Sequence, residues 1–396
     1  MTGRRTATRS TMPADDAKLV AATWAGSRLL LAAILAAIVV SGHGLRAALG
    51  NWDVRHFITI SRHWYADPLE MAFFPGLPAV MAGGARIGLA PEITGAVLAL
   101  VCSGVAAAAL YRIGGTVPTC LWLIAPTAVF TTVGYTEAPF CAAAFWAWER
   151  ARAGRWWQAA GLAALACTFR VSGLFLVGAL AVMAVVGDGQ WRDGRGRDGR
   201  TRKARAPKRG LRAGVERIAP LLLPALVLVA YVVYLHGLTG SWTAWFQAQD
   251  RGWGRGFTTP QESLANTLPA TRTDTWRATY GADAGIVAML FKLEIVSMLV
   301  GVATTVYCLV RRRWASAAWV GVQVIAFSIG HWFMSVNRAV LLWFPLFIAL
   351  AELTRGPGRP VGLKLLWRGI VAVLVLADLA VMGWWGWLFF TGRWAS

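Results

Sequence analysis

The sequence predicts an all-α polytopic membrane protein. Of its 396 residues, 57% are hydrophobic and only 15% are charged. The apolar residues fall in blocks close to the ~20 residues with which a helix crosses the ~30 Å hydrocarbon core. Helices and closed barrels alone satisfy their backbone groups within lipid, and the alternating pattern of a barrel is absent. We therefore expect about ten or eleven transmembrane helices.

The first predicted span covers roughly 19–49 and follows a basic N-terminal segment, 1–18. Basic residues are retained on the cytoplasmic side, so the N-terminus is expected inside and the polar loop 50–72 outside. No small-residue cleavage site follows the apolar stretch, and this favours an uncleaved span over a signal peptide.

Further apolar blocks complete an N-terminal module, 19–187. They lie near 73–90, 92–111, 118–134, 138–149, 157–170 and 172–187. Six spans would return the chain to the side on which it started, but loop 50–72 before these blocks is expected outside and the basic loop after them inside. One of the first three blocks should therefore be re-entrant, half-length or merged with a neighbour. Pro75 and Pro78 favour 73–90, because proline interrupts helices and irregular backbone is tolerated where it lines a protein cavity.

A basic, glycine-containing loop, 188–217, precedes a C-terminal module, 218–396. The net charge of +20 comes largely from such loops. This pattern is typical of cytoplasmic segments near anionic headgroups, and we expect no nucleic-acid partner. The C-terminal module should have a long non-apolar outer loop, 239–283, and spans near 218–238, 284–310, 315–334, 339–353 and 369–390.

Several sequence motifs are absent, and their absence limits the kinds of reaction and donor to be considered. All five cysteines lie in apolar segments without a CxxC pair, which predicts core residues and neither a disulfide frame nor a metal site. The sequence contains no P-loop, GxGxxG, GxSxG or DxD motif. A nucleotide-sugar donor used in the cytoplasm is therefore disfavoured, and a lipid-linked donor used on the outer face fits better.

The outer loop carries the first candidate for catalysis, Asp53, in the segment Asn51–Phe57. A carboxylate at a membrane edge is costly and is usually functional. Partial desolvation raises its pKa and suits it to take a proton from an attacking hydroxyl. The alternative is that Asp53 caps a helix or pairs with Arg55.

Other polar and aromatic residues of this loop are candidates for substrate contact. Trp52 could stack on a sugar ring, although an interfacial aromatic belt explains it equally well. His56 and Glu70 are suited to polar contacts with a sugar or phosphate. Together with His63 and Asp67 they match no compact metal-ligand pattern, so we expect no metal and no cofactor.

Ionisable residues in or beside apolar segments form a second group of candidates. Arg170 is suited to bind a phosphate, with a structural ion pair to Glu137 as the alternative. Arg338 is a second candidate phosphate contact, with snorkelling as the alternative. Gln249 lies among the aromatics of 239–283, a composition typical of both carbohydrate-binding surfaces and interfacial loops.

Taken together, these segments resemble the PIG-V-like mannosyltransferases, a family related to GPI mannosyltransferase II within the GT-C superfamily. The matching pieces follow the family's order and cover most of the chain. They are Trp52–Phe57, Ala72–Pro75 with Pro78, Gly134–Glu137, Phe169–Gly173, Gln249–Arg255 and Arg338–Pro345.

The resemblance implies a GT-C-like bundle with an extracytoplasmic active-site loop after the first helix. It implies inverting transfer of mannose from a polyprenyl-phosphate-mannose donor to a lipid, glycan or protein acceptor. In that scheme Asp53 deprotonates the acceptor, and Arg170 or Arg338 steadies the departing lipid phosphate. Trp52, His56, Glu70, Glu137 and Gln249 complete the expected substrate-binding set.

Three alternatives stay open: another polyprenyl-linked sugar, a flippase or transporter for such lipids, and a non-catalytic membrane scaffold. The high content of Ala, Gly, Arg and Trp indicates a bacterial origin, so the expected location is the plasma membrane.

Overall fold

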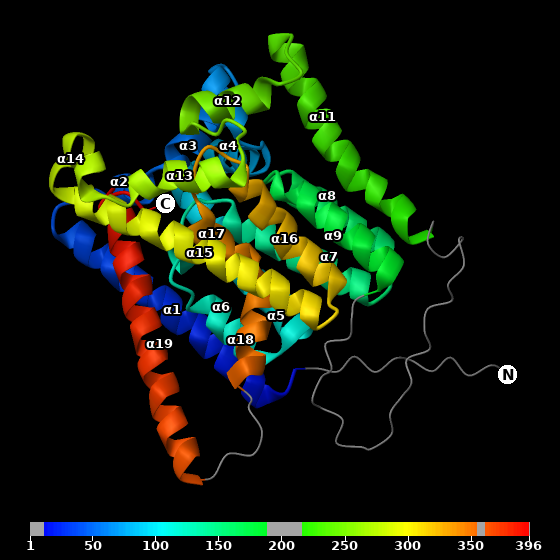
Figure 1. The fold of residues 1–396 in the computed structure, drawn as a ribbon. Helices are drawn as coiled ribbons and strands as arrows, with labels where there is room; N and C mark the ends of the chain where they lie inside the picture. The colour runs from blue at the N-terminus through cyan, green and yellow to red at the C-terminus, as the bar shows by residue number, and fades with distance from the viewer. Residues whose placement is uncertain (1–11, 188–215, 355–360, 396) are drawn as a thin grey trace.

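The computed structural model describes residues 12–187, 216–354 and 361–395 (Figure 1). Apart from an isolated bridge between Phe257 and Gly330, these residues contain no strand. Five helices are long and apolar enough to cross a membrane: Ala14–Val40, Pro91–Gly114, Glu216–Thr239, Thr273–Val310 and Gly369–Phe390. A bent pair, Val336–Leu342 and Phe344–Thr354, forms a sixth if it is one broken span. The all-α polytopic class is confirmed, and the chain is an integral membrane protein.

The helices before the basic loop are, in order, α1 (Ala14–Val40), α2 (Leu45–Leu49), α3 (Asp53–His63), η1 (Pro68–Ala72), α4 (Gly76–Arg86), α5 (Pro91–Gly114), α6 (Thr116–Leu123), η2 (Ala128–Thr131), α7 (Glu137–Arg152), α8 (Trp156–Cys167) and α9 (Ser172–Val186). Those after it are η3 (Ala219–Leu221), α11 (Leu222–Thr239), α12 (Ala244–Trp253), α13 (Pro260–Ala270), α14 (Thr273–Tyr280), η4 (Gly281–Asp283), α15 (Ala284–Val310), α16 (Trp314–Ser328), α17 (Val336–Ala339), η5 (Val340–Leu342), α18 (Phe344–Thr354) and α19 (Val361–Phe390). The η helices are 3₁₀ helices.

The helices long enough to span are fewer than the ten or eleven expected, because several predicted blocks form short or broken helices. The irregularity predicted for 73–90 is confirmed, since α4 has 11 residues and rises only about 16 Å. The block 118–134 is also broken, although only one of the first three blocks was expected to be irregular and 73–90 was favoured. Here α6 ends at Leu123 and η2 starts at Ala128, on either side of Pro126, whose ring disfavours helix in the residue before it.

The segment 239–283, which we expected to be a long non-apolar loop, is largely helical. It forms α12, α13 and α14, which lie with α3 and α4 at one end of the bundle (Figure 1). The start of α13 carries a capping box, in which Thr259 and Glu262 each satisfy a backbone N–H of the other. Most of each predicted basic segment, 1–11 of 1–18 and 188–215 of 188–217, lies outside the described residues.

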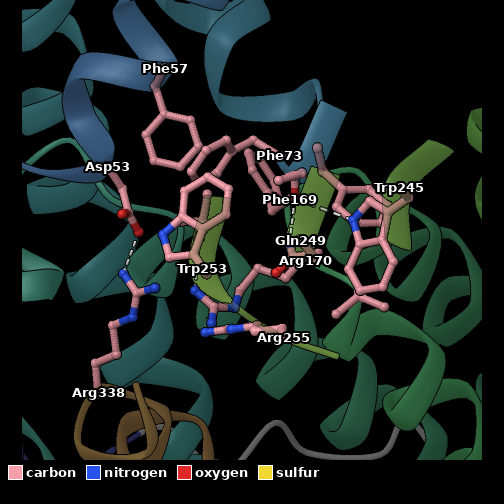
Figure 2. Close-up of a pocket in the computed structure, with 14 residues that line it drawn as sticks. Asp53, Phe57, Phe73, Phe169, Arg170, Trp245, Gln249, Trp253, Arg255 and Arg338 are labelled. Atoms are coloured by element: carbon pink, nitrogen blue, oxygen red, sulfur yellow. Dashed lines mark hydrogen bonds and ion pairs between the residues drawn. The ribbon is translucent and has the colours of Figure 1, made fainter. Parts of the chain in front are cut away.

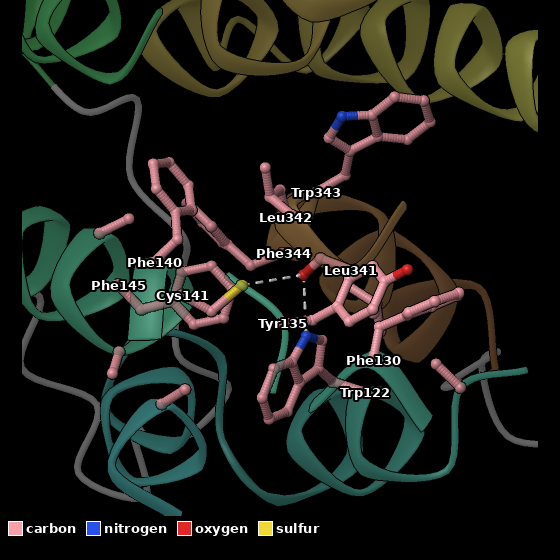
Figure 3. Close-up of a cluster of buried hydrophobic side chains, with 14 of the residues drawn as sticks. Trp122, Phe130, Tyr135, Phe140, Cys141, Phe145, Leu341, Leu342, Trp343 and Phe344 are labelled. Atoms are coloured by element: carbon pink, nitrogen blue, oxygen red, sulfur yellow. Dashed lines mark hydrogen bonds between the residues drawn. The ribbon is translucent and has the colours of Figure 1, made fainter. Parts of the chain in front are cut away.

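The bend between η5 and α18 leaves backbone carbonyls without helical partners, and tryptophans satisfy them. Trp122 Nε1 donates to the carbonyl of Leu341 at 2.8 Å, and Trp319 Nε1 donates to that of Leu342 at 2.9 Å. Figure 3 shows the Leu341 carbonyl inside the aromatic core, where it also accepts from the Cys141 thiol. Because water is excluded there, these bonds permit irregular backbone inside the bundle.

Small residues let the elements beneath the predicted active-site loop approach closely. Gly95 of α5 faces Gly134, directly before Tyr135, and a Cβ on Gly95 would lie 2.8 Å from the Cα of Gly134. Small residues at such contacts are the usual way in which membrane helices pack tightly.

Gly95→Ala should therefore destabilise the protein by about 1–3 kcal/mol through overpacking. The added Cβ would meet the flexible end of Met81 at 2.5 Å and also the backbone of Gly134, which cannot move aside. Gly178→Ala is the matched control, since a Cβ at this helical glycine of α9 meets nothing within 4 Å. Thermal unfolding in detergent should show a lower midpoint for Gly95→Ala alone. Equal midpoints for the two variants would contradict the close contact.

Candidate active site

A tight turn after α2 fixes the position of Asp53. Asn51 Nδ2 donates to the Phe389 carbonyl at 2.9 Å, and Trp52 Nε1 donates to that of Arg393 at 2.8 Å. These bonds tie the turn to the end of α19, and Trp52 adopts a φ of 56°, a left-handed value that is unusual for a bulky residue. Asp53 is then the first residue of α3, where the helix dipole favours its negative charge.

Asp53 is paired with Arg338, the residue of α17 that follows it by 285 positions. Arg338 Nη1 donates to Asp53 Oδ2 at 2.5 Å, and the two side chains are 12% and 16% exposed. Burial by itself would raise the pKa of Asp53. The charge and hydrogen bond of Arg338, with smaller contributions from His56 and Arg255, outweigh burial and hold that pKa below its usual value. The raised pKa expected from the sequence was therefore wrong, because the buried partner Arg338 was not foreseen.

Glu137 links this ion pair to Arg170. Arg170 Nη1 donates to Glu137 Oε1 at 2.6 Å and to Thr136 Oγ1 at 2.9 Å. Arg338 Nε lies 3.7 Å from the same Glu137 oxygen. Glu137 is fully buried at the start of α7 and does not line the pocket. Its carboxylate therefore contacts Arg170 and Arg338 on the side away from the pocket.

These groups face a pocket of about 580 Å³, part of which is open to solvent. Figure 2 shows the Asp53–Arg338 pair, Arg170 and Arg255 around the same hollow. The remaining lining residues are mostly aromatic: Phe57, Ala72, Phe73, Phe74, Thr136, Phe169, Val171, Trp245, Gln249 and Trp253. A surface that combines aromatic faces with a few charged groups is suited to a sugar bearing an anionic substituent.

Gln249 and Trp245 fix the aromatic wall. Gln249 Nε2 and Trp245 Nε1 both donate to the carbonyl of Ala72, at 3.0 and 3.2 Å. Gln249 thus lines the pocket as expected, while its amide nitrogen holds the segment that carries Phe73.

Arg255 belongs to the pocket but was absent from the predicted site set. Its Nη2 donates to Ser335 Oγ at 3.3 Å, and no carboxylate lies within ion-pair distance among the residues that the structure describes. Burial, with the charges of Arg338 and Arg170, lowers the pKa of Arg255 to about 10, so it stays protonated at neutral pH. Nothing in the composition of 239–283 distinguished this arginine from its neighbours; the resemblance of Gln249–Arg255 was the available signal.

The local charge balance favours an anion. Arg338 is paired with Asp53 and Arg170 with Glu137, whereas Arg255 has no carboxylate within ion-pair distance among the described residues. The guanidinium of Arg255 is therefore the most available to a ligand, and a phosphate matches its planar donors.

His56 and Glu70 form a second polar pair beside the pocket. His56 Nδ1 lies 3.1 and 3.2 Å from the two Glu70 oxygens, and its ring stacks on Phe73 at 5.0 Å. Burial lowers the pKa of His56, but Glu70, Asp53 and Asp67 outweigh it and raise the pKa above its usual value. The pair contacts the pocket wall from outside, since neither residue lines the hollow itself.

The structure thus brings four predicted site residues into one pocket: Asp53, Arg170, Gln249 and Arg338. Glu137, His56 and Glu70 lie immediately around it. Trp52 points elsewhere, and its ring packs against Trp394 at 5.8 Å. In the described part of the chain no group of three His, Cys, Asp or Glu residues could hold a metal ion.

Known proteins share part of this sequence. GPI alpha-1,6-mannosyltransferase 2 of Mus musculus is 35% identical over 156 residues, which are 35% of this chain and 32% of the mouse protein. The rat protein of the same name is 34% identical over 155 residues and the human one 33% over 157, with the same 32% of each covered. The relatives support a PIG-V-like family. The chain spans about a third of the length of these curated relatives, and no protein-family model or solved structure matches it.

Glu70→Gln should lower the pKa of His56, because the amide offers no negative charge to the imidazolium. A raised pKa contributes stability that is fully present below the unfolded-state value of about 6.5 and is lost as pH rises through the folded-state value. Thermal unfolding should show wild type more stable than the variant by about 1 kcal/mol at about pH 6, with the gap closing at alkaline pH.

The control is the same substitution in a His56→Gln background, where no imidazole titrates. There the effect of Glu70→Gln should be independent of pH over this range. A gap that stays constant with pH in the wild-type background would contradict the assigned ion pair.

Proposed function

We propose that this protein is an inverting mannosyltransferase that uses a polyprenyl-phosphate-mannose donor. The observation that carries the proposal is the placement of a carboxylate, Asp53, and three guanidinium groups in one aromatic-lined pocket. The names of the partial relatives supply the sugar. The acceptor is a hydroxyl of a lipid, glycan or protein.

In the proposed step the acceptor oxygen attacks the anomeric carbon of mannose as the bond from that carbon to the phosphate oxygen breaks. The hydroxyl proton passes to the Asp53 carboxylate, and the lipid phosphate leaves with the bonding electrons. The low pKa of Asp53 keeps it ionised at neutral pH. Such a carboxylate accepts the proton late, when bond formation has already acidified the attacking hydroxyl.

The leaving phosphate gains negative charge in the transition state, and positioned cations stabilise that charge more than they stabilise the ground state. Arg255 is the first proposed phosphate contact, and Arg170, which lines the pocket while Glu137 holds it, is the second. Arg338 donates directly to Asp53, so its proposed role is to orient the base.

A second cavity supports a lipid-linked donor. It has about 600 Å³ of empty space and shares Phe74 with the charged pocket. Its walls are almost entirely apolar and come largely from α11, a candidate membrane span: Trp64, Phe74, Pro75, Cys167, Thr168, Val227, Ala230, Tyr231 and Tyr234. We assign this cavity to the prenyl chain, whose phosphate would then reach Arg170 and Arg255.

We also propose an outer-face site in a bacterial plasma membrane. The α1 helix separates the basic N-terminal segment from the Asp53 turn by one candidate span. Because basic segments are retained inside, this arrangement favours the outer side for the pocket.

Asp53→Asn should reduce transfer by about 10²–10⁴-fold, because the amide cannot accept the acceptor's proton. Purified protein in detergent, radiolabelled polyprenyl-phosphate-mannose and host membrane lipids provide the assay. The control is Asp67→Asn, an exposed loop residue whose replacement can still accept the backbone N–H of Leu69. Wild-type transfer by folded Asp53→Asn would overturn the proposed base.

Arg255→Gln should lower kcat/KM for the lipid donor by about 10–100-fold, through loss of a charged contact to the phosphate. Arg251→Gln on α12 is the matched control, because it removes the same charge from an exposed position four residues away. Equal losses in the two variants would indicate a general charge effect and contradict a specific phosphate contact.

A further inference from the structure

We infer that Glu294 of α15 is a positioning residue for the two pocket arginines Arg255 and Arg338. The effect of Glu294 on catalysis rests on the proposed function, whereas its contacts with residues 335–337 are independent of that function. Glu294 lines neither the charged pocket nor the apolar cavity described above, and it was not a predicted site residue. Its side chain acts through the backbone of a neighbouring segment.

Glu294 is 3% exposed on a helix that qualifies as a membrane span. An unpaired carboxylate is very costly in such surroundings. Its oxygens accept three successive backbone N–H groups, from Ser335 at 3.0 Å, Val336 at 2.6 Å and Asn337 at 3.0 Å. One side chain therefore satisfies the backbone donors at the start of α17.

The segment that receives these bonds is conformationally strained. Ser335 has a φ of 66°, a left-handed value that costs a non-glycine residue about 1 kcal/mol or more. The Ser335 hydroxyl does not cap α17 and instead accepts the hydrogen bond of Arg255. Glu294 replaces the missing cap from another helix and so stabilises this backbone.

Two more positions on the same face of α15 hold the segment. Ser297 Oγ donates to Asn337 Oδ1 at 2.8 Å, and Asn337 Nδ2 donates to the Leu290 carbonyl at 3.2 Å. Leu290, Glu294 and Ser297 are spaced four and three residues apart, so they form one stripe along the helix.

The position of residues 335–337 affects both the proposed base and the proposed phosphate contact. Arg338 follows Asn337 directly and donates to the proposed base at 2.5 Å, while Arg255 is hydrogen-bonded to Ser335. Displacement of residues 335–338 would therefore loosen the cation beside the base and the cation proposed for the phosphate. Glu294 itself touches neither substrate nor reacting atoms in this scheme.

The test is Glu294→Gln, whose amide group presents N–H donors to the N–H groups of the loop. Hydrogen exchange should be faster in peptides covering 333–339, and affinity for farnesyl phosphate, a sugar-free probe, should fall about tenfold. The matched control is Glu352→Gln on α18, because Glu352 pairs with Arg313 and Tyr307 elsewhere on the helices. Glu294→Asp should give an intermediate result.

The pH profile of kcat/KM adds a measurement that a purely structural role of Glu294 would leave unchanged. Asp53 is faced by Arg338, His56 and Arg255, with the Tyr135 hydroxyl on its backbone. If Glu294→Gln displaces Arg338, the pKa of Asp53 rises, and the acid limb of kcat/KM moves up by about one pH unit. The Glu352→Gln profile should coincide with that of wild type.

The outcomes separate this inference from the proposed function. If wild type transfers no mannose, the proposed function fails, while exchange and farnesyl phosphate binding still decide the role of Glu294. If Glu294→Gln does not fold, Ser297→Ala removes one hydroxyl from the same stripe and should shift both readouts in the same direction, by less. Unchanged exchange and affinity within about twofold of wild type in the folded variant would overturn the inference.

Discussion

The arrangement of the site depends on the ion pair between Asp53 and Arg338. Two charges that are largely removed from water must compensate each other, because either one alone would carry a large desolvation cost. The pair joins the first residue of α3 to α17, which lies near the opposite end of the chain. Its formation therefore requires the turn before α3, the start of α7 and the bent helix pair 336–354 to be correctly packed, and the same contact keeps the proposed base ionised.

Irregular backbone around this pair is what brings the charges together. Arg338 lies just before the bend at Trp343, Asp53 follows the turn at Trp52, and Arg170 lies between α8 and α9. A continuous helix at any of these points would direct its side chains along one helical stripe. The structure compensates for the lost helical bonds with tryptophan indoles, the Asn51 amide and Glu294, so each break has identifiable hydrogen-bond partners.

The sequence was sufficient for the fold class and for Arg170 and Arg338, because isolated charges in apolar sequence are conspicuous. Asp53 was found as a carboxylate beside the first predicted span, and Gln249 as an amide among the aromatics of 239–283. It was insufficient for Arg255, which lies among other polar residues in a segment whose helices were not predicted. Glu294 lies in a strongly apolar block, and its role depends on backbone donors 41 to 43 residues away. The block 118–134 was one of three in which an irregular span was expected, but Pro75 and Pro78 favoured 73–90, and the structure breaks both. Hydropathy reports composition, whereas these features depend on which segments pack together.

The pocket also changes how the two predicted modules should be understood. Asp53 and Arg170 precede the basic loop 188–217, whereas Gln249, Arg255 and Arg338 follow it. Likewise, the apolar cavity combines Phe74 and Cys167 with Tyr231 and Tyr234 from α11. Asp53 and Arg170 thus come from one module, whereas Arg255, Arg338 and four of the nine residues that line the apolar cavity come from the other. A chain cut at this loop would separate the base from Arg338, so the chemistry that we propose requires both modules packed in one bundle.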